Sequence, residues 1–124
     1  MSGIYIHIPF CRKACHYCNF HFSTQIQHLD AFVDALIKEI ALQENYLNSP
    51  IETLYFGGGT PSLLQQAHLD KIVNALHKHF NLSDLKEFTL EANPDDISIE
   101  KTKYWKTAGV NRLSIGIQSF QQEA

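Results

Sequence analysis

Short apolar runs alternate with amphipathic segments along almost the whole chain, and this alternation constrains the fold more than any other feature. Four runs have the β-branched and aromatic content of buried strands: residues 3–8, 53–56, 87–92 and 111–117. Apolar residues at spacings of three and four predict a helix after each of the first three: about Gln27 to Leu47, Ser62 to Phe80, and about Ser98 to Gly109. This order requires parallel strands joined by helical crossovers.

Local signals refine the helices and the roles of their histidines. Ser62, with Gln65 three places later, predicts a capping box at the start of the second helix. Gly109 is a natural left-handed cap for the third. The histidines on or beside helices have no carboxylate or cysteine near them in the sequence, so we assign them to surfaces: His28, His68, His77 and His79.

The unusual residues decide between a doubly wound sheet and a β/α barrel, which typically needs about 250 residues. They follow the ends of successive strands: three cysteines, the glycines at 57–59, Glu91 with Asn93, and Gln118. Carboxyl ends of parallel strands share one edge, so these residues predict a single site. The chain stops where a fifth unit would begin. We therefore expect an α/β fold, in which residues 1–124 form the N-terminal half of a partial barrel whose remaining strands are absent.

Composition excludes several classes of protein. The 124 residues are 44% hydrophobic, which suits one small domain with its own core. A formal charge of -3, with no basic cluster beyond Arg12 and Lys13, argues against nucleic acid as a partner. No apolar run approaches the roughly 18 residues of a transmembrane helix, and no export signal opens the chain. An odd, clustered set of cysteines indicates reduced thiols, hence a cytoplasmic protein.

All three cysteines lie in one loop, at Cys11, Cys15 and Cys18. Such a loop can hold zinc, with His16 or His21 as the fourth ligand. It can also hold an iron–sulfur cluster with one iron left without a protein ligand, or its thiols can be unligated. The spacing alone leaves these alternatives open. An open iron would be chemically useful, since a small molecule can occupy it.

"CRKACHYC" resembles the Cys-x3-Cys-x2-Cys signature of the radical S-adenosylmethionine (SAM) superfamily. More narrowly, "YIHIPFC", "YFGGGTPSLL", "LEANP" and "RLSIGIQSF" are similar, in this order, to the oxygen-independent coproporphyrinogen III oxidase group. Together they span residues 5–120. The resemblance implies a partial TIM-like radical SAM barrel, a 4Fe-4S cluster whose open iron binds SAM, and reductive cleavage of SAM to a 5'-deoxyadenosyl radical.

The resemblance also implies site residues. Cys11, Cys15 and Cys18 would ligate three irons of the cluster. The residues that match cofactor-contacting positions are Tyr5, Tyr17, Gly58, Gly59, Thr60, Glu91 and Gln118. Plainer interpretations remain beside these. The glycines can form an ordinary tight turn, Glu91 can be a solvated rim residue, and Tyr5 and His7 can be core or barrel-interior residues. Glycines can also offer a ligand unhindered N–H and C=O groups.

Within the group, the sequence looks closest to the HemW-type haem chaperones. The chain begins four residues before Tyr5, without the long extension of the dehydrogenase, and Phe20 stands where the dehydrogenase has a fourth cysteine. This branch implies haem as a further ligand and a respiratory haem protein as acceptor; the electron donor is unknown. The alternatives are a coproporphyrinogen III oxidase that forms protoporphyrinogen IX, and a non-catalytic zinc- or cluster-binding module. Residues 1–124 alone would hold only part of the pocket, so we expect weak SAM binding and no activity from them.

Overall fold

The computed structural model describes residues 2–9, 22–45, 49–59 and 61–115. In chain order the elements are β1 (Ser2–Ile8), α2 (Phe22–Leu42), β2 (Ile51–Gly58), the 3-10 turn η1 (Pro61–Leu63), α3 (Gln66–His79), β3 (Glu87–Ala92), the 3-10 turn η2 (Pro94–Asp96), α4 (Ile99–Ala108) and β4 (Arg112–Ile115). The predicted alternation of strands and helices is confirmed. No helix in this part of the chain is both long and apolar enough to cross a membrane.

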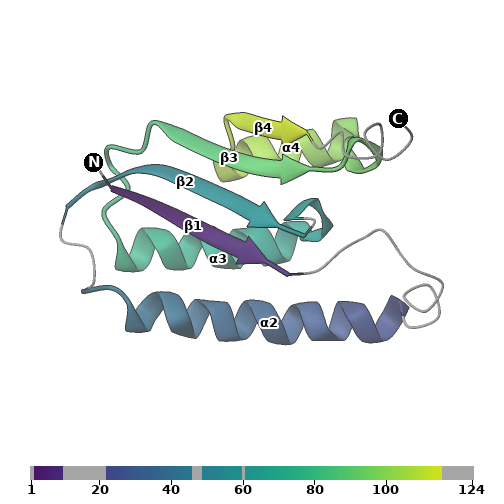
Figure 1. Cartoon of the computed structure of the whole chain (residues 1–124), viewed down its shortest axis with the longest axis horizontal. Coiled ribbons are helices and arrows are strands. Elements are labelled where there is room, and N and C mark those ends of the chain that lie inside the picture. Colours follow the sequence, from purple (N-terminus) through teal and green to yellow (C-terminus); the bar gives the residue numbers. More distant parts are fainter. Residues whose placement is uncertain (1, 10–21, 46–48, 60, 116–124) are drawn as a thin grey trace, which may run out of the picture.

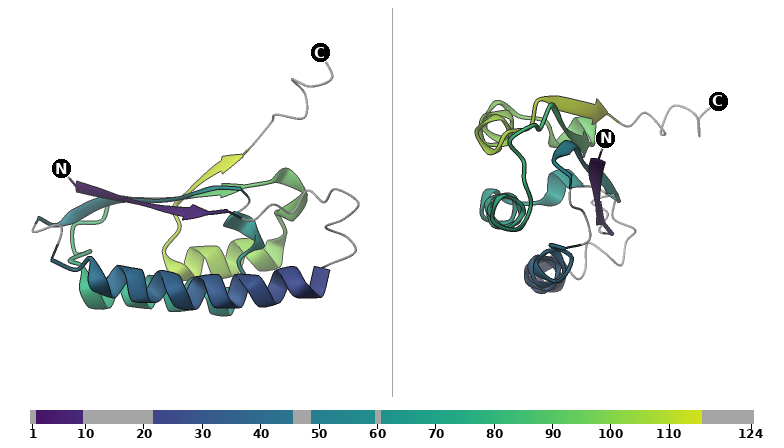
Figure 2. Two further views of the ribbon diagram at one scale, coloured as in Figure 1. Left: turned by 60° about the horizontal axis from the view of Figure 1, so that its bottom comes forward. Right: turned by 90° about the vertical axis from the view of Figure 1, so that its left-hand side faces the viewer.

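The four strands form one parallel sheet in the order β1-β2-β3-β4 (Figure 1). Helices α2, α3 and α4 all lie on one face of this sheet, as Figure 2 shows. A doubly wound sheet reverses its strand order and carries helices on both faces. Consecutive order with helices on one face is instead the arrangement of a β/α barrel wall, so the predicted fold class is confirmed.

The core lies between the sheet and the helices. Alternate strand residues point toward the helices and are buried, among them Ile6, Leu54, Phe56, Phe88 and Leu90. The rings of Phe56 and Phe88 on neighbouring strands lie 5.3 Å apart between centroids. The helices contribute the apolar stripes expected from their spacing, including Val33, Ile72, Leu76 and Trp105. The intervening strand residues therefore face the opposite, helix-free side.

Several predicted boundaries differ from the structure. Strand β2 covers Ile51–Gly58, longer than the predicted residues 53–56, and helix α2 begins at Phe22 and not near Gln27. Helix α2 runs from Phe22 to Leu42, ending five residues before the predicted Leu47. Its apolar stripe supports it only to Ile40, which is buried, whereas Leu42 is 80% exposed. The predicted capping box at Ser62 and Gln65 is also wrong. Ser62 lies in η1 and its hydroxyl donates to Asp96 (2.9 Å), while Gln65 is the N-cap of α3 and its backbone N–H donates to Nδ1 of His68 (3.1 Å).

Both ends of α4 match the prediction. Ser98 is the N-cap, and its hydroxyl accepts from the N–H of Lys101 at 3.1 Å. Gly109 is the C-cap, in the left-handed conformation at φ +111°. Strand β3 also has the predicted bounds, residues 87–92.

The assignment of all four histidines to the surface is wrong for His68. It is only 4% exposed, and its Nε2 contacts the carboxylate of Asp30 on α2. Since Nδ1 accepts the Gln65 N–H, Nε2 carries the proton and donates to Asp30. His79, half-buried, similarly contacts Glu44 at 2.6 Å. Both carboxylates are more than 30 residues away in sequence and are brought near by the packing of α2 on α3.

We expect His68→Ala to lower the free energy of unfolding by about 2 kcal/mol, because it leaves the Gln65 N–H without its acceptor and opens a cavity. Urea unfolding followed by circular dichroism measures this. The matched control is Asp34→Ala, which breaks the exposed Lys71–Asp34 pair (3.9 Å) between the same helices. Its cost should stay below about 0.5 kcal/mol. Equal stability of the two variants would contradict a structural role for His68.

Candidate functional site

The carboxyl ends of β1, β2 and β3 bring several predicted residues together. The register aligns His7 with Gly57 and Ile8 with Gly58. Between β3 and β4, Glu91 aligns with Ser114. The side chains of Tyr5, Tyr55 and Glu91 alternate with the buried core residues, so they face the helix-free side of the sheet.

Glu91 is held from two directions. Its Oε1 accepts the backbone N–H of Gly58 at 3.1 Å, and its Oε2 accepts the hydroxyl of Tyr55 at 2.6 Å. Both donors belong to β2, the neighbouring strand. Each carboxylate oxygen has two lone pairs, so both can accept a further hydrogen bond from a ligand. A solvated rim carboxylate would have neither contact, and Glu91 is therefore an organised group.

The two loop glycines use their N–H groups inside the protein. The N–H of Gly58 is used by Glu91, and the N–H of Gly59 donates to the carbonyl of Ile8 at 2.7 Å. The expectation that these glycines offer unhindered N–H groups to a ligand is therefore wrong. Carbonyls beside a carboxylate suit an ammonium or a hydroxyl group, whereas a phosphate needs donors.

Gly58 is required by the local backbone. It has φ +109°, and a Cβ built there would lie 2.7 Å from the carbonyl oxygen of Ile8 and 2.8 Å from Nδ1 of His7. The glycines are thus more than an ordinary tight turn, since strand β1 passes too close for any side chain. This contact joins the loop to the end of β1, after which the cysteine segment begins.

Aromatic rings line the same face. The rings of Tyr5 and Tyr55 are stacked, with centroids 5.6 Å apart and planes inclined by 15°. The Tyr5 hydroxyl lies 3.4 Å from Nδ1 of His7. Tyr5 is 56% exposed, so its ring is open to a ligand on this face and is not a core residue. The rings of Tyr5 and Tyr55 and the carboxylate of Glu91 thus form one polar and aromatic surface on the helix-free side of the sheet.

The comparisons with known proteins bear on this arrangement. The family model of the radical SAM superfamily matches residues 5–124. The chain belongs to this superfamily. It is 44% identical to the haem chaperone HemW of Bacillus subtilis over 99% of this chain and 33% of that protein. It is 33% identical to the oxygen-independent coproporphyrinogen III oxidase of Salmonella typhimurium over 98% of this chain and 27% of that protein.

One solved structure matches as well. Coproporphyrinogen III oxidase (HemN) from Escherichia coli, described as a radical SAM enzyme, aligns with a TM-score of 0.75 and 30% identity. The alignment covers 94% of this chain and 27% of that one. The chain thus spans about a third of the length of the relatives it matches. The four-stranded sheet is the corresponding part of the radical SAM fold.

The predicted site residues fall into two sets. Tyr5, Gly58, Gly59 and Glu91 lie together at the carboxyl ends of three strands, linked by the contacts above. The others lie outside the described residues: Cys11, Cys15, Cys18, Tyr17, Thr60 and Gln118. Within the described part, no group of three or more histidine, cysteine or acidic side chains has the arrangement of a metal site.

The sequence analysis missed Tyr55 at the candidate site. It was interpreted only as a strand residue, yet it contacts both Tyr5 and Glu91. The available signal was its position two residues before Gly57, on the same face as the end of the strand. Thr89 was also missed. It pairs with Tyr55 across the sheet, and its buried hydroxyl has no hydrogen-bond partner among the described residues.

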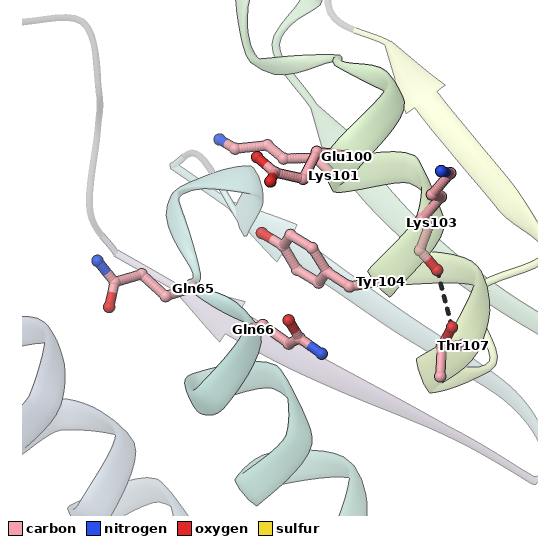
Figure 3. Close-up of a pocket in the computed structure, with 7 residues that line it drawn as sticks. All are labelled: Gln65, Gln66, Glu100, Lys101, Lys103, Tyr104 and Thr107. Carbon is pink, nitrogen blue, oxygen red and sulfur yellow. Dashed lines mark hydrogen bonds between the residues drawn. The ribbon is translucent and has the colours of Figure 1, made fainter.

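A separate groove of about 500 Å³ lies on the helical side of the sheet, between the start of α3 and α4 (Figure 3). Its main polar groups are already engaged. The Tyr104 hydroxyl donates to the carbonyl of Leu64 (2.9 Å), and Nζ of Lys101 lies 3.3 Å from the carbonyl of Ser62 and 3.9 Å from Asp96. These contacts join η1 and η2 to α4. We therefore interpret the groove as part of the packing between these elements and not as part of the candidate site.

Proposed function

We propose that residues 1–124 form the N-terminal part of a radical SAM core domain that binds a 4Fe-4S cluster and SAM. The observation that carries this proposal is Glu91, whose carboxylate is held by Gly58 and Tyr55 beside a glycine loop whose N–H groups are already engaged. This set fits the amino group of SAM, which supplies only donors. The stacked and exposed ring of Tyr5 adds an apolar contact on the same face.

In this proposal Cys11, Cys15 and Cys18 ligate three irons, and the chemistry supplied by the bound cluster and SAM is reductive cleavage of SAM. The protein's own groups bind and orient. Glu91 and the carbonyls of Gly58 and Gly59 accept from the amino group, and Thr60 extends that loop. Tyr5 and Tyr17 border the cofactor, and Gln118 supplies polar contacts to the ribose. Further contacts would come from strands outside residues 1–124.

We further propose that the protein acts as a HemW-like haem chaperone, in the cytoplasm, handing haem to a respiratory haem protein. The support is the identity to HemW of Bacillus subtilis, 44% against 33% for the coproporphyrinogen III oxidase of Salmonella typhimurium. Phe20, where the dehydrogenase group has a fourth cysteine, points the same way. Haem would then be a ligand in addition to SAM.

A second candidate is oxygen-independent coproporphyrinogen III oxidase, favoured by the structural match to HemN from Escherichia coli. Its substrate would be coproporphyrinogen III and its product protoporphyrinogen IX. A third is a zinc- or cluster-binding module without catalysis, which the cysteine spacing alone allows.

One preparation separates the three. We expect the whole protein, purified without oxygen, to contain iron and sulfide but no stoichiometric zinc, to bind haem in a spectroscopic titration, and to release no carbon dioxide from coproporphyrinogen III with SAM and a reductant. Decarboxylation would establish the oxidase and refute the chaperone. Stoichiometric zinc without sulfide would refute the radical SAM assignment for this protein and support the third candidate. A cluster-containing protein that binds no haem would contradict the chaperone alone.

A further inference from the structure

Tyr55 contacts both the carboxylate of Glu91 and the aromatic ring of Tyr5 at the candidate site. Its hydroxyl donates to Oε2 of Glu91 at 2.6 Å, a short bond to a charged acceptor. Its ring stacks on Tyr5. Tyr55 belongs to neither the cysteine motif nor the glycine loop.

We propose that Tyr55 is a positioning residue that fixes the Glu91 carboxylate in the orientation in which it accepts the amino group of SAM. The inference rests on the proposed function, because it assumes that Glu91 contacts SAM. Tyr55 would raise the affinity for SAM through Glu91 and would not contact the reacting atoms.

The geometry supports this in two ways. A carboxylate with one held oxygen can still rotate about its terminal bond, but Glu91 has both oxygens held, by Gly58 and by Tyr55. The second donor has few alternative orientations, since the Tyr55 side chain has only two torsions and its ring stacks on Tyr5. The orientation of Glu91 is therefore set before a ligand arrives, which reduces the ordering cost of binding.

The proton on Tyr55 is secure at neutral pH. The hydrogen bond to Glu91 raises the pKa of Tyr55 above 10.0, and partial burial acts in the same direction, against a smaller opposite effect of the Ser114 hydroxyl. The phenol therefore remains a hydrogen-bond donor to Glu91 at neutral pH.

The test uses the whole protein, reconstituted anaerobically with iron and sulfide, and measures the dissociation constant of SAM by calorimetry. Tyr55→Phe keeps the ring and removes only the hydroxyl; we expect it to weaken SAM binding about 3- to 10-fold. The matched control is Tyr104→Phe, which removes another bonded tyrosine hydroxyl, on α4 and away from the site. It should leave the constant within about twofold.

Two more measurements separate positioning from a general structural effect. In the Glu91→Gln variant, SAM should bind about tenfold more weakly, and adding Tyr55→Phe should then cost clearly less than in the unmodified protein. Ultraviolet titration of tyrosinate, with Tyr55→Phe as the reference, should show the pKa of Tyr55 falling toward 10.0 when Glu91 becomes Gln.

The outcomes distinguish the inference from the proposed function. If Glu91→Gln binds SAM as tightly as the unmodified protein, or if the unmodified protein binds none, the proposed role of Glu91 is wrong and the inference falls with it. If Glu91→Gln is weak but Tyr55→Phe matches Tyr104→Phe, the function stands and the inference is overturned. Equal costs of Tyr55→Phe with and without the Glu91 carboxylate would also overturn it.

Discussion

Cys15→Ala is expected to abolish the proposed iron–sulfur cluster, as would loss of Cys11 or Cys18. In the proposed site each of three thiolates holds one iron, and the fourth iron has no protein ligand. Loss of one cysteine would leave the cluster with only two protein ligands. The iron content of the anaerobically reconstituted protein should fall from about four per chain to well under one, with sulfide and the visible absorption of the cluster lost in parallel.

His16→Ala is the informative control for Cys15→Ala. His16 lies next to Cys15 and would be a ligand if the loop held zinc with three thiolates and one imidazole. On the cluster proposal, His16→Ala keeps its full iron and sulfide. Full iron in Cys15→Ala would refute the ligand assignment, and loss of metal in both variants would favour zinc.

Gly58→Ala is expected to be the most destabilising change among the described residues of the site. An alanine at position 58 would be held at φ +109°, which is unfavourable for any residue with a side chain. Its Cβ would lie 2.7 Å from the backbone oxygen of Ile8, so strand β1 or the loop must shift. We expect a loss of about 3 kcal/mol in the free energy of unfolding, measured by urea denaturation. SAM binding should also weaken at least about tenfold, because the Gly58 N–H that orients Glu91 moves with the loop.

Gly109→Ala provides a matched comparison, since Gly109 has nearly the same φ, +111°. There the new Cβ would meet only the ring of Phe88, with Cδ2 at 3.5 Å and Cε2 at 3.9 Å, both ordinary contacts. The cost should be the conformational part alone, about 1 kcal/mol, with no change in SAM affinity. If the two substitutions lowered the free energy of unfolding equally, the close approach of β1 would add nothing to the destabilisation at position 58.

The sequence predicted well what depends on local periodicity. The bounds of β3, the Ser98 and Gly109 caps and the meeting of Gly58 with Glu91 at the strand ends follow from alternation, side-chain chemistry and the shared polarity of parallel strands. It failed where a residue's partner is distant in the chain. His68 and Asp30 are 38 residues apart, and Tyr55 and Glu91 are 36 apart. Those pairs depend on how α2 packs on α3 and on the register of β2 with β3, which periodicity does not specify.

The use of both glycine N–H groups inside the protein has a consequence for selectivity in the cell. Adenine nucleotides share the adenosine part of SAM but carry phosphates where SAM carries a sulfonium and an amino acid. At this strand edge a phosphate would meet the Glu91 carboxylate and carbonyl oxygens with no N–H from Gly58 or Gly59 to receive it. On the proposed function, this part of the site therefore favours the amino group of SAM over a phosphate.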